Sequence, residues 1–182
     1  MKLPTYLKLI IAVGISELAG VVGALFTTPQ IEGWYSTLVK PSWNPPAWVF
    51  GPVWTVLFAL IGVALFLVWQ QNWRVARPLI GWAGKAWNGW SERLWRGDLQ
   101  QFNIIALFGL QYMLNIAWSV VFFGLHAPGA AFFVLCALWC AIVYLIINFY
   151  RVSTWAAWLL VPYLAWVTFA GILNLAVWML NP

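Results

Sequence analysis

Five long runs of apolar residues constrain the fold of this chain more than any other feature. Each run is long enough to cross the hydrocarbon core of a bilayer, for which a helix needs roughly 20 residues. Lipid cannot satisfy free backbone donors and acceptors, so a continuous apolar run predicts a helix, whereas a β-barrel would alternate apolar and polar residues. We therefore predict an all-α integral membrane protein, a five-transmembrane-helix bundle. Its spans are expected at about residues 6–27, 48–70, 102–123, 129–150 and 155–180.

Composition excludes a soluble domain, because 64% of the 182 residues are hydrophobic and only 7% are charged. Lys2 and Lys8 before an apolar run imitate a secretory signal, but the run continues to Phe26 without a convincing cleavage site. It is therefore expected to be the first span. The sequence shows no internal repeat and no domain break, which predicts a single membrane domain over residues 1–182.

The formal net charge of +5 comes mainly from the segment between the second and third spans. Basic residues beside apolar spans predict contact with the lipid bilayer and its headgroups, and nucleic acid is not an expected partner. The positive-inside rule favours a cytoplasmic N-terminus, but we leave the membrane topology open. Within this connector, residues 71–101, the apolar residues between Leu79 and Leu94 share one helical stripe, which predicts a helix on the membrane surface.

The sequence has few of the groups that catalysis or metal binding requires. Its one histidine, His126, lies in a short turn, and Cys136 and Cys140 have no third ligand nearby, so they are expected to be small core residues. We expect no metal, no cofactor and no catalytic residue of the usual acid, base or nucleophile kinds. Glu17, inside the first span, is either a functional group or a protonated carboxyl bonded to a neighbouring helix.

Prolines and tryptophans crowd the loop between the first two spans, residues 40–54. Proline restricts its own backbone and that of the preceding residue, so this stretch predicts a stiff, extended entry to the second span, suited to a lid over a binding site. Beyond it, Trp54 and Phe58 share one helical face. Asn115 and Trp118 share a stripe of the third span with Gln111 and Phe122, where the two amides either hold helices together or serve a ligand.

Several motifs in chain order resemble the translocator protein / tryptophan-rich sensory protein family (TspO/MBR). The most specific runs from Trp34-Tyr35 through Lys40-Pro41-Ser42-Trp43-Asn44-Pro45-Pro46 to Gly51-Pro52-Val53-Trp54. Further agreement lies at Leu114-Asn115-Ile116-Ala117-Trp118, Phe122-Phe123-Gly124, Pro162-Tyr163-Leu164-Ala165-Trp166 and Leu173-Asn174. The family commonly has Tyr where this chain has Phe58, and the connector between spans two and three is longer here. The cholesterol-recognition pattern that follows the last span in some members lacks its basic residue here.

The resemblance implies a tetrapyrrole ligand, such as a porphyrin or haem, held between the spans beneath the first loop. Its flat, apolar body suits indole rings, which bury and stack on π-systems. Carried over residue by residue, the expected ligand-binding set is Trp34, Pro45, Trp54, Phe58, Asn115, Trp118 and Trp166.

Three functions follow from this resemblance. The first is a membrane receptor or sensor that regulates a tetrapyrrole or stress response. The second is light-dependent porphyrin degradation, with Trp54 and Trp166 beside the excited ligand, and the third is transport of a porphyrin or sterol. The resemblance also implies a homodimer, for which Ala106 and Gly109 in the third span permit close approach. A bacterial cell membrane is the expected location, with outer membranes of bacteria or mitochondria as alternatives.

Overall fold

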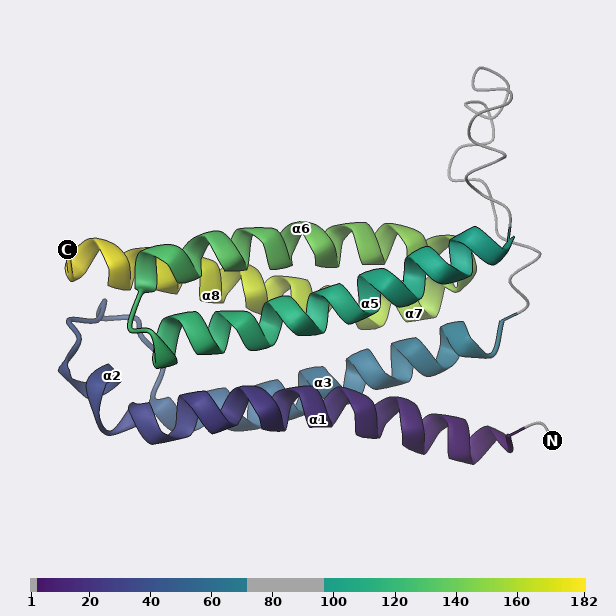
Figure 1. Ribbon diagram of the computed structural model, residues 1–182, viewed down its shortest axis with the longest axis horizontal. Coiled ribbons are helices and arrows are strands. Elements are labelled where there is room, and N and C mark those ends of the chain that lie inside the picture. The colour runs from purple at the N-terminus through teal and green to yellow at the C-terminus, as the bar shows by residue number, and fades with distance from the viewer. Residues whose placement is uncertain (1–2, 72–96) are drawn as a thin grey trace, which may run out of the picture.

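The protein is an elongated bundle of helices that run along one common axis (Figure 1). The computed structural model describes residues 3–71 and 97–182, and for residues 97–103 it describes the backbone alone. The helices are α1 (Thr5–Ile31), α2 (Trp34–Thr37), α3 (Ala47–Trp69), α5 (Gly97–Ser119), the π-helical turn η3 (Val120–Gly124), α6 (Pro128–Val152), α7 (Thr154–Leu159) and α8 (Val161–Leu180).

The five-span prediction is confirmed. Five helical segments in the described ranges are long and apolar enough to cross a membrane: Thr5–Ile31, Ala47–Trp69, Ile104–Gly124, Pro128–Val152 and Thr154–Leu180. The described ends of the chain lie at opposite ends of the bundle, as an odd number of spans requires (Figure 1). The predicted surface helix between Leu79 and Leu94 falls outside the described residues.

Prolines shape two of the spans differently. The last span breaks at Leu160, between α7 and α8, two residues before Pro162, as expected from a ring that removes a backbone donor. Pro29, by contrast, lies inside the last turn of α1, so this helix continues to Ile31 and ends later than predicted. Pro29 lacks the N–H that would donate to the Leu25 carbonyl, and α1 ends two residues after it.

The buried core joins α3, α5, α6, α7 and α8. Its largest fully buried side chains include Tyr163, Phe149 and Ile61. Helix α1 packs mainly against α3 and α5. Its close approach to α3 depends on Gly62, where an added Cβ would lie 2.6 Å from the Cα of Val13 and 3.0 Å from the Ala12 carbonyl oxygen.

The same two helices separate toward the α2 end of the bundle. At Gly51, eleven residues before Gly62 in α3, an added Cβ would meet no neighbour within 4 Å. Helices α1 and α3 are therefore in backbone contact at one end and apart at the other. The space between them at the α2 end holds the cavity described next.

The cysteine prediction is wrong. Cys136 and Cys140 are both exposed and unpaired on α6, so they face outward from the bundle, whereas Asn148 on the same helix is buried. Their apolar character suits a lipid-facing surface as well as a protein core, and for this reason side-chain type alone did not separate the two.

Candidate functional site

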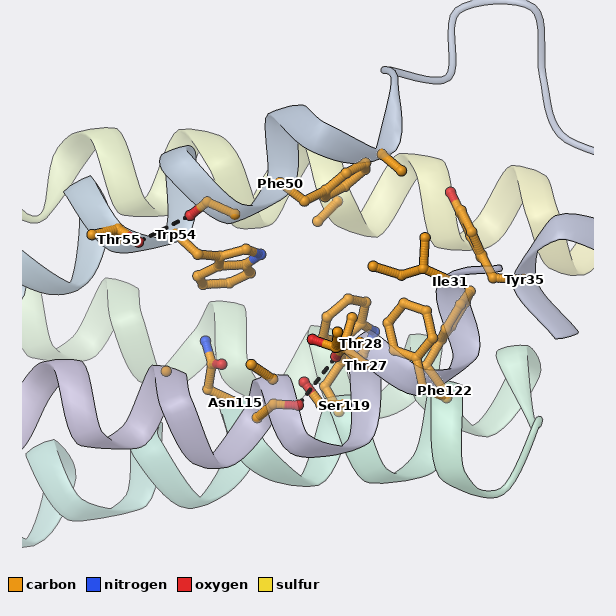
Figure 2. A pocket seen from close by; sticks show the side chains of 18 of the residues that line it. Thr27, Thr28, Ile31, Tyr35, Phe50, Trp54, Thr55, Asn115, Ser119 and Phe122 are labelled. Atoms are coloured by element: carbon orange, nitrogen blue, oxygen red, sulfur yellow. Dashed lines mark hydrogen bonds between the residues drawn. The ribbon is translucent and has the colours of Figure 1, made fainter. Parts of the chain in front are cut away.

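A cavity of about 290 Å³ lies between α1, α3, α5 and α8 at the α2 end of the bundle (Figure 2). Aromatic rings form much of its wall. They come from three elements besides α2: Phe50, Trp54 and Phe58 from α3, Trp118 from α5, and Phe122 and Phe123 from η3. Trp54 and Phe58 stack with ring centroids 5.5 Å apart. Such a wall suits a flat apolar molecule.

Small residues of α1 form the opposite wall. Gly20 lies against the ring of Phe58, where an added Cβ would approach two ring carbons to 2.6 Å. At Gly23 an added Cβ would lie 3.2 Å from the Ser119 hydroxyl oxygen. Both glycines therefore allow neighbouring helices of the bundle to pack closely against α1. Gly20 and Gly23 also line the cavity, where Phe58 and Ser119 occupy the space that side chains at these positions would take.

The cavity opens between α1 and α3. The lining residues nearest this opening are exposed: Val21, Ala24 and Thr28 on α1, and Ala47, Gly51 and Thr55 on α3. Across the cavity, Asn115 and Ser119 are each only 5% exposed. The cavity is therefore asymmetric. Its side on α5, which we call the floor, carries the buried polar residues Asn115 and Ser119, and its other side is open between the membrane-spanning helices α1 and α3.

The floor is braced by a chain of buried hydrogen bonds. The Tyr163 hydroxyl donates to Gln111 Oε1 at 3.0 Å and accepts from Asn115 Nδ2 at 3.1 Å. Gln111 is fully buried and does not line the cavity, whereas Asn115 does. The two interpretations of these amides thus apply to different residues, because Gln111 joins helices while Asn115 both joins helices and faces the cavity.

A second set of bonds fixes Trp118. Its indole Nε1 donates to Asn174 Oδ1 at 3.0 Å, and Asn174 Nδ2 donates to the Pro128 carbonyl at 2.7 Å. This arrangement ties α5, α8 and the start of α6 together behind the cavity. The Trp118 ring is thereby held in one orientation in the wall.

The loop between α1 and α3 covers the α2 end of the cavity. Tyr35 lines the cavity and donates its hydroxyl to Asn44 Oδ1 at 3.0 Å, which ties α2 to the proline-rich segment. Burial raises the pKa of the Tyr35 hydroxyl, and the hydrogen bond to Asn44 opposes that shift in part. Asn181 at the end of α8 clamps the loop by accepting from the Val39 amide at 3.0 Å and donating to the Val39 carbonyl at 2.9 Å.

Comparison with known proteins agrees with this architecture. Residues 12–179 match the model of the TspO/MBR family. The chain belongs to the TspO/MBR family. The tryptophan-rich protein TspO of Chlorobaculum tepidum is 39% identical over 97% of each chain, and the protein of the same name from Archaeoglobus fulgidus is 34% identical over 96% of this chain and 97% of its own. The human translocator protein is 36% identical over 86% of this chain and 80% of its own.

Four of the residues predicted for the ligand site of this TspO/MBR protein line the cavity together. They are Trp54, Phe58, Asn115 and Trp118, and they come from two different helices, α3 and α5. The cavity has the location that the resemblance implies, between the spans and beneath the first loop. Their role in binding a ligand stays a prediction.

The other three predicted residues do not line the cavity but lie one contact away or in the loop. Trp34 stacks on His126 with ring centroids 4.4 Å apart and meets Phe122 edge-on at 5.5 Å. Trp166 meets Phe50 edge-on at 5.8 Å, and its Nε1 is buried without a hydrogen-bond partner among the described residues. Pro45 belongs to the loop segment, and its carbonyl accepts from the side chain of Asn44.

Several lining residues were missing from the sequence-based set, most notably Tyr35, Ser119 and Phe122. A signal existed for Phe122, which shares a helical stripe with Asn115 and Trp118. The π-helical turn η3 could not be foreseen, and its wider turn buries Phe122 and Phe123 side by side. Ser119 gave no signal, since a serine near a helix end usually bonds to the backbone.

Proposed function

We propose that this TspO/MBR protein is a membrane receptor or sensor that binds a tetrapyrrole in the cavity and thereby regulates a tetrapyrrole or stress response. The observation that carries the proposal is the set of aromatic rings, Trp54, Phe58, Trp118 and Phe122, around one open space. A tetrapyrrole is flat, largely apolar and π-rich, and such a body gains most from rings that bury it and stack on it.

The charged parts of a tetrapyrrole also find a suitable place. The carboxylates of its propionate groups need a cation, and Lys40 Nζ lies 4.8 Å from the centroid of the Tyr35 ring, which lines the cavity. Lys40 donates to the Ser36 and Leu38 carbonyls, so the loop holds this ammonium group beside the covered end of the cavity. We expect the propionates to lie there, with the macrocycle directed inward.

The size of the cavity sets a limit on how the ligand fits. Small-molecule sites commonly measure roughly 300–1,000 Å³, and the 290 Å³ here is at the lower end. A whole macrocycle therefore extends into the opening between α1 and α3 or separates these helices on binding. In either case, the exposed residues at the opening, Gly51 above all, contact the ligand.

The test is a titration of protein in nanodiscs with protoporphyrin, first in the dark and then under light. The variants are Trp54→Phe and Trp166→Phe, singly and together. Trp155→Phe is the control, because Trp155 is 77% exposed on α7. A sensor predicts saturable binding, an unchanged porphyrin spectrum after illumination, and weaker binding for Trp54→Phe but not for the control.

Two results would redirect the proposal. Light-dependent loss of the porphyrin band that disappears in Trp54→Phe would favour the degrading enzyme, and porphyrin flux across vesicles would favour a transporter. An absence of saturable porphyrin binding by the wild-type protein would contradict the sensor, the degrading enzyme and porphyrin transport.

A further inference from the structure

Some hydrogen-bonding groups in the cavity wall have partners within the protein, and others have none among the described residues. Most of its side-chain donors already have acceptors within the protein. Thr27 Oγ1 donates to the Gly23 carbonyl at 3.1 Å, and Thr55 Oγ1 donates to the Gly51 carbonyl at 3.1 Å (Figure 2). Tyr35, Asn115 and Trp118 donate as described above. The indole N–H of Trp54 is without a partner among the described residues. The donors that the wall keeps for a ligand are thus this indole N–H and the hydroxyls of Thr28 and Ser119, which can also accept.

Acceptors in the same wall remain available. Asn115 Oδ1 and the Ser119 hydroxyl line the cavity, and neither has a hydrogen-bond partner among the described residues, although both residues are 95% buried. Glu17 lines the cavity as well. Among the described residues that line the cavity, Glu17 is the one carboxylic acid, and none is a lysine, arginine or histidine.

Glu17 has no hydrogen-bond or ion-pair partner within the described part of the chain. The neighbouring hydroxyls are committed elsewhere, because Tyr112 donates to Ser16 and Ser16 donates to the Ala12 carbonyl. The alternative in which Glu17 bonds to a neighbouring helix therefore finds no support among these residues. A carboxyl at this depth of a membrane span is costly and needs a compensating partner.

The position of Glu17 along the cavity follows from its neighbours. Gly20, one turn further along α1, lies against Phe58, and Ser16 bonds to Tyr112 and lies 3.0 Å from an added Cβ at Gly62. Glu17 is thus at the end of the cavity where α1 and α3 close on each other, away from the loop and Lys40. The two ends of the cavity differ in charge, with a carboxyl at the closed end and an ammonium at the covered end.

We infer that Glu17 determines ligand specificity by binding a basic nitrogen or N–H group at the closed end of the cavity, so that flat aromatic amines are a second class of ligand for this site. The inference rests on the proposed function only in using the same cavity. Asn115 Oδ1 is the neighbouring acceptor for a second N–H. An ammonium or amidinium group there both compensates the carboxyl within the span and forms charge-assisted hydrogen bonds.

A matched pair of probes tests this inference. Aminoacridine, with its amino group on the central ring, is a fluorescent cation with N–H donors, and acridine has the same rings, is neutral at mildly alkaline pH and carries no donor. Both are titrated against full-length protein in nanodiscs of phosphatidylcholine alone, since anionic lipid would bind the cation. The variant is Glu17→Gln, which keeps the shape of the side chain and removes its charge.

The control variant is Glu32→Gln, the same substitution at an exposed residue that follows α1 and does not line the cavity. We expect Glu17→Gln to weaken aminoacridine binding about 10-fold or more, as loss of a charge-assisted hydrogen bond implies. Acridine binding should change less than about twofold, and Glu32→Gln should change neither.

Three results would overturn the inference. They are no aminoacridine binding by the wild-type protein, equal binding by Glu17→Gln, and an equal loss of both probes, which would assign Glu17 a structural role. Protoporphyrin titrated against the same samples separates this inference from the proposed function. Amine binding that depends on Glu17 would stand even if porphyrin did not bind, and porphyrin binding would stand even if the amine did not bind.

Discussion

The two ends of the α1–α3 pair both contain glycine in α3, yet the helices are in contact at one end and leave a space at the other. At the closed end, around Gly62, the helices touch through backbone atoms, and a Cβ would lie 2.6 Å from the Val13 Cα. At the hollow end, around Gly51, a Cβ would meet nothing within 4 Å. Glycine permits close helix contact at Gly62 and leaves space at Gly51. The identity of a residue therefore does not reveal which of these roles it has.

The difference arises from what faces the glycines. Gly62 faces the backbone of α1, so removing a side chain brings the helices together. At the hollow end, large rings on α3, α5 and η3 and small residues of α1 line one space, and the proline-rich loop connects α1 to α3 beside it. One pair of helices therefore has a closed end and a hollow end.

The largest expected effect comes from filling the closed end. Gly62→Ala should destabilise the protein by about 1–3 kcal/mol, because the new methyl group clashes with backbone that cannot move without separating α1 from α3. Gly51→Ala is the matched control on the same helix, and should be neutral or stabilising by up to about 1 kcal/mol, since alanine favours helix. Thermal unfolding in one detergent compares them, and equal melting temperatures would contradict the asymmetry.

The second-largest effect on stability is expected from the buried hydrogen bonds that Tyr163 forms at the floor of the cavity. Tyr163→Phe removes the hydroxyl that joins Gln111 to Asn115, and should cost about 1–2 kcal/mol by leaving two buried amides without that partner. Tyr150→Phe is the control, because Tyr150 is 54% exposed on α6, and it should change stability by less than about 0.5 kcal/mol. Unfolding measurements distinguish them, and a neutral Tyr163→Phe would show that the floor does not depend on this chain.

A smaller effect is expected from releasing the loop. Asn181→Ala removes both hydrogen bonds to Val39 and should lower stability by less than about 1 kcal/mol, since these bonds are exposed to solvent. The Val39 amide should nevertheless exchange its hydrogen faster in deuterated buffer. Gln70→Ala, at an exposed residue after α3, is the control. Unchanged exchange at Val39 would mean that other contacts hold the loop in place.

The smallest effect on the folded chain is expected at Gly109. This residue is exposed on α5 with no atom within 4 Å of an added Cβ, so Gly109→Leu should leave the unfolding temperature nearly unchanged. If the predicted homodimer forms through this face, the larger side chain should reduce crosslinked dimer in native membranes. Dimer formed equally by both proteins would exclude Gly109 from the interface, and wild-type protein that crosslinks only as a monomer would contradict the dimer itself.

Much of the fold could be predicted from the sequence, because membrane spans follow from backbone chemistry alone. The five apolar runs indicated the five spans. The orientation of single residues was harder. Cys136 and Cys140 were assigned to the core and lie on the surface, since lipid and protein interior favour the same apolar side chains.

The candidate site was predicted in part. Trp54, Phe58, Asn115 and Trp118 share helical faces that turned out to face one cavity. Trp166 was expected beside them, but Phe50 lies between it and the cavity, and a helical stripe cannot show which residue of a neighbouring helix intervenes. The place of Gly20 and Gly23 in the cavity wall was also missed, because small residues in a span indicate close helix packing and do not by themselves indicate a ligand site.

The central claim is that the hollow end of the bundle is the ligand site, and filling it tests the claim most directly. Gly51→Trp places an indole at the opening of the cavity where an added side chain has room, and Gly14→Trp makes the same change at an exposed glycine of α1 outside the cavity. Protoporphyrin binding is measured for both in nanodiscs. The account predicts that Gly51→Trp loses binding while its melting temperature stays near that of the wild type, and that Gly14→Trp retains both. Wild-type affinity in Gly51→Trp would contradict it.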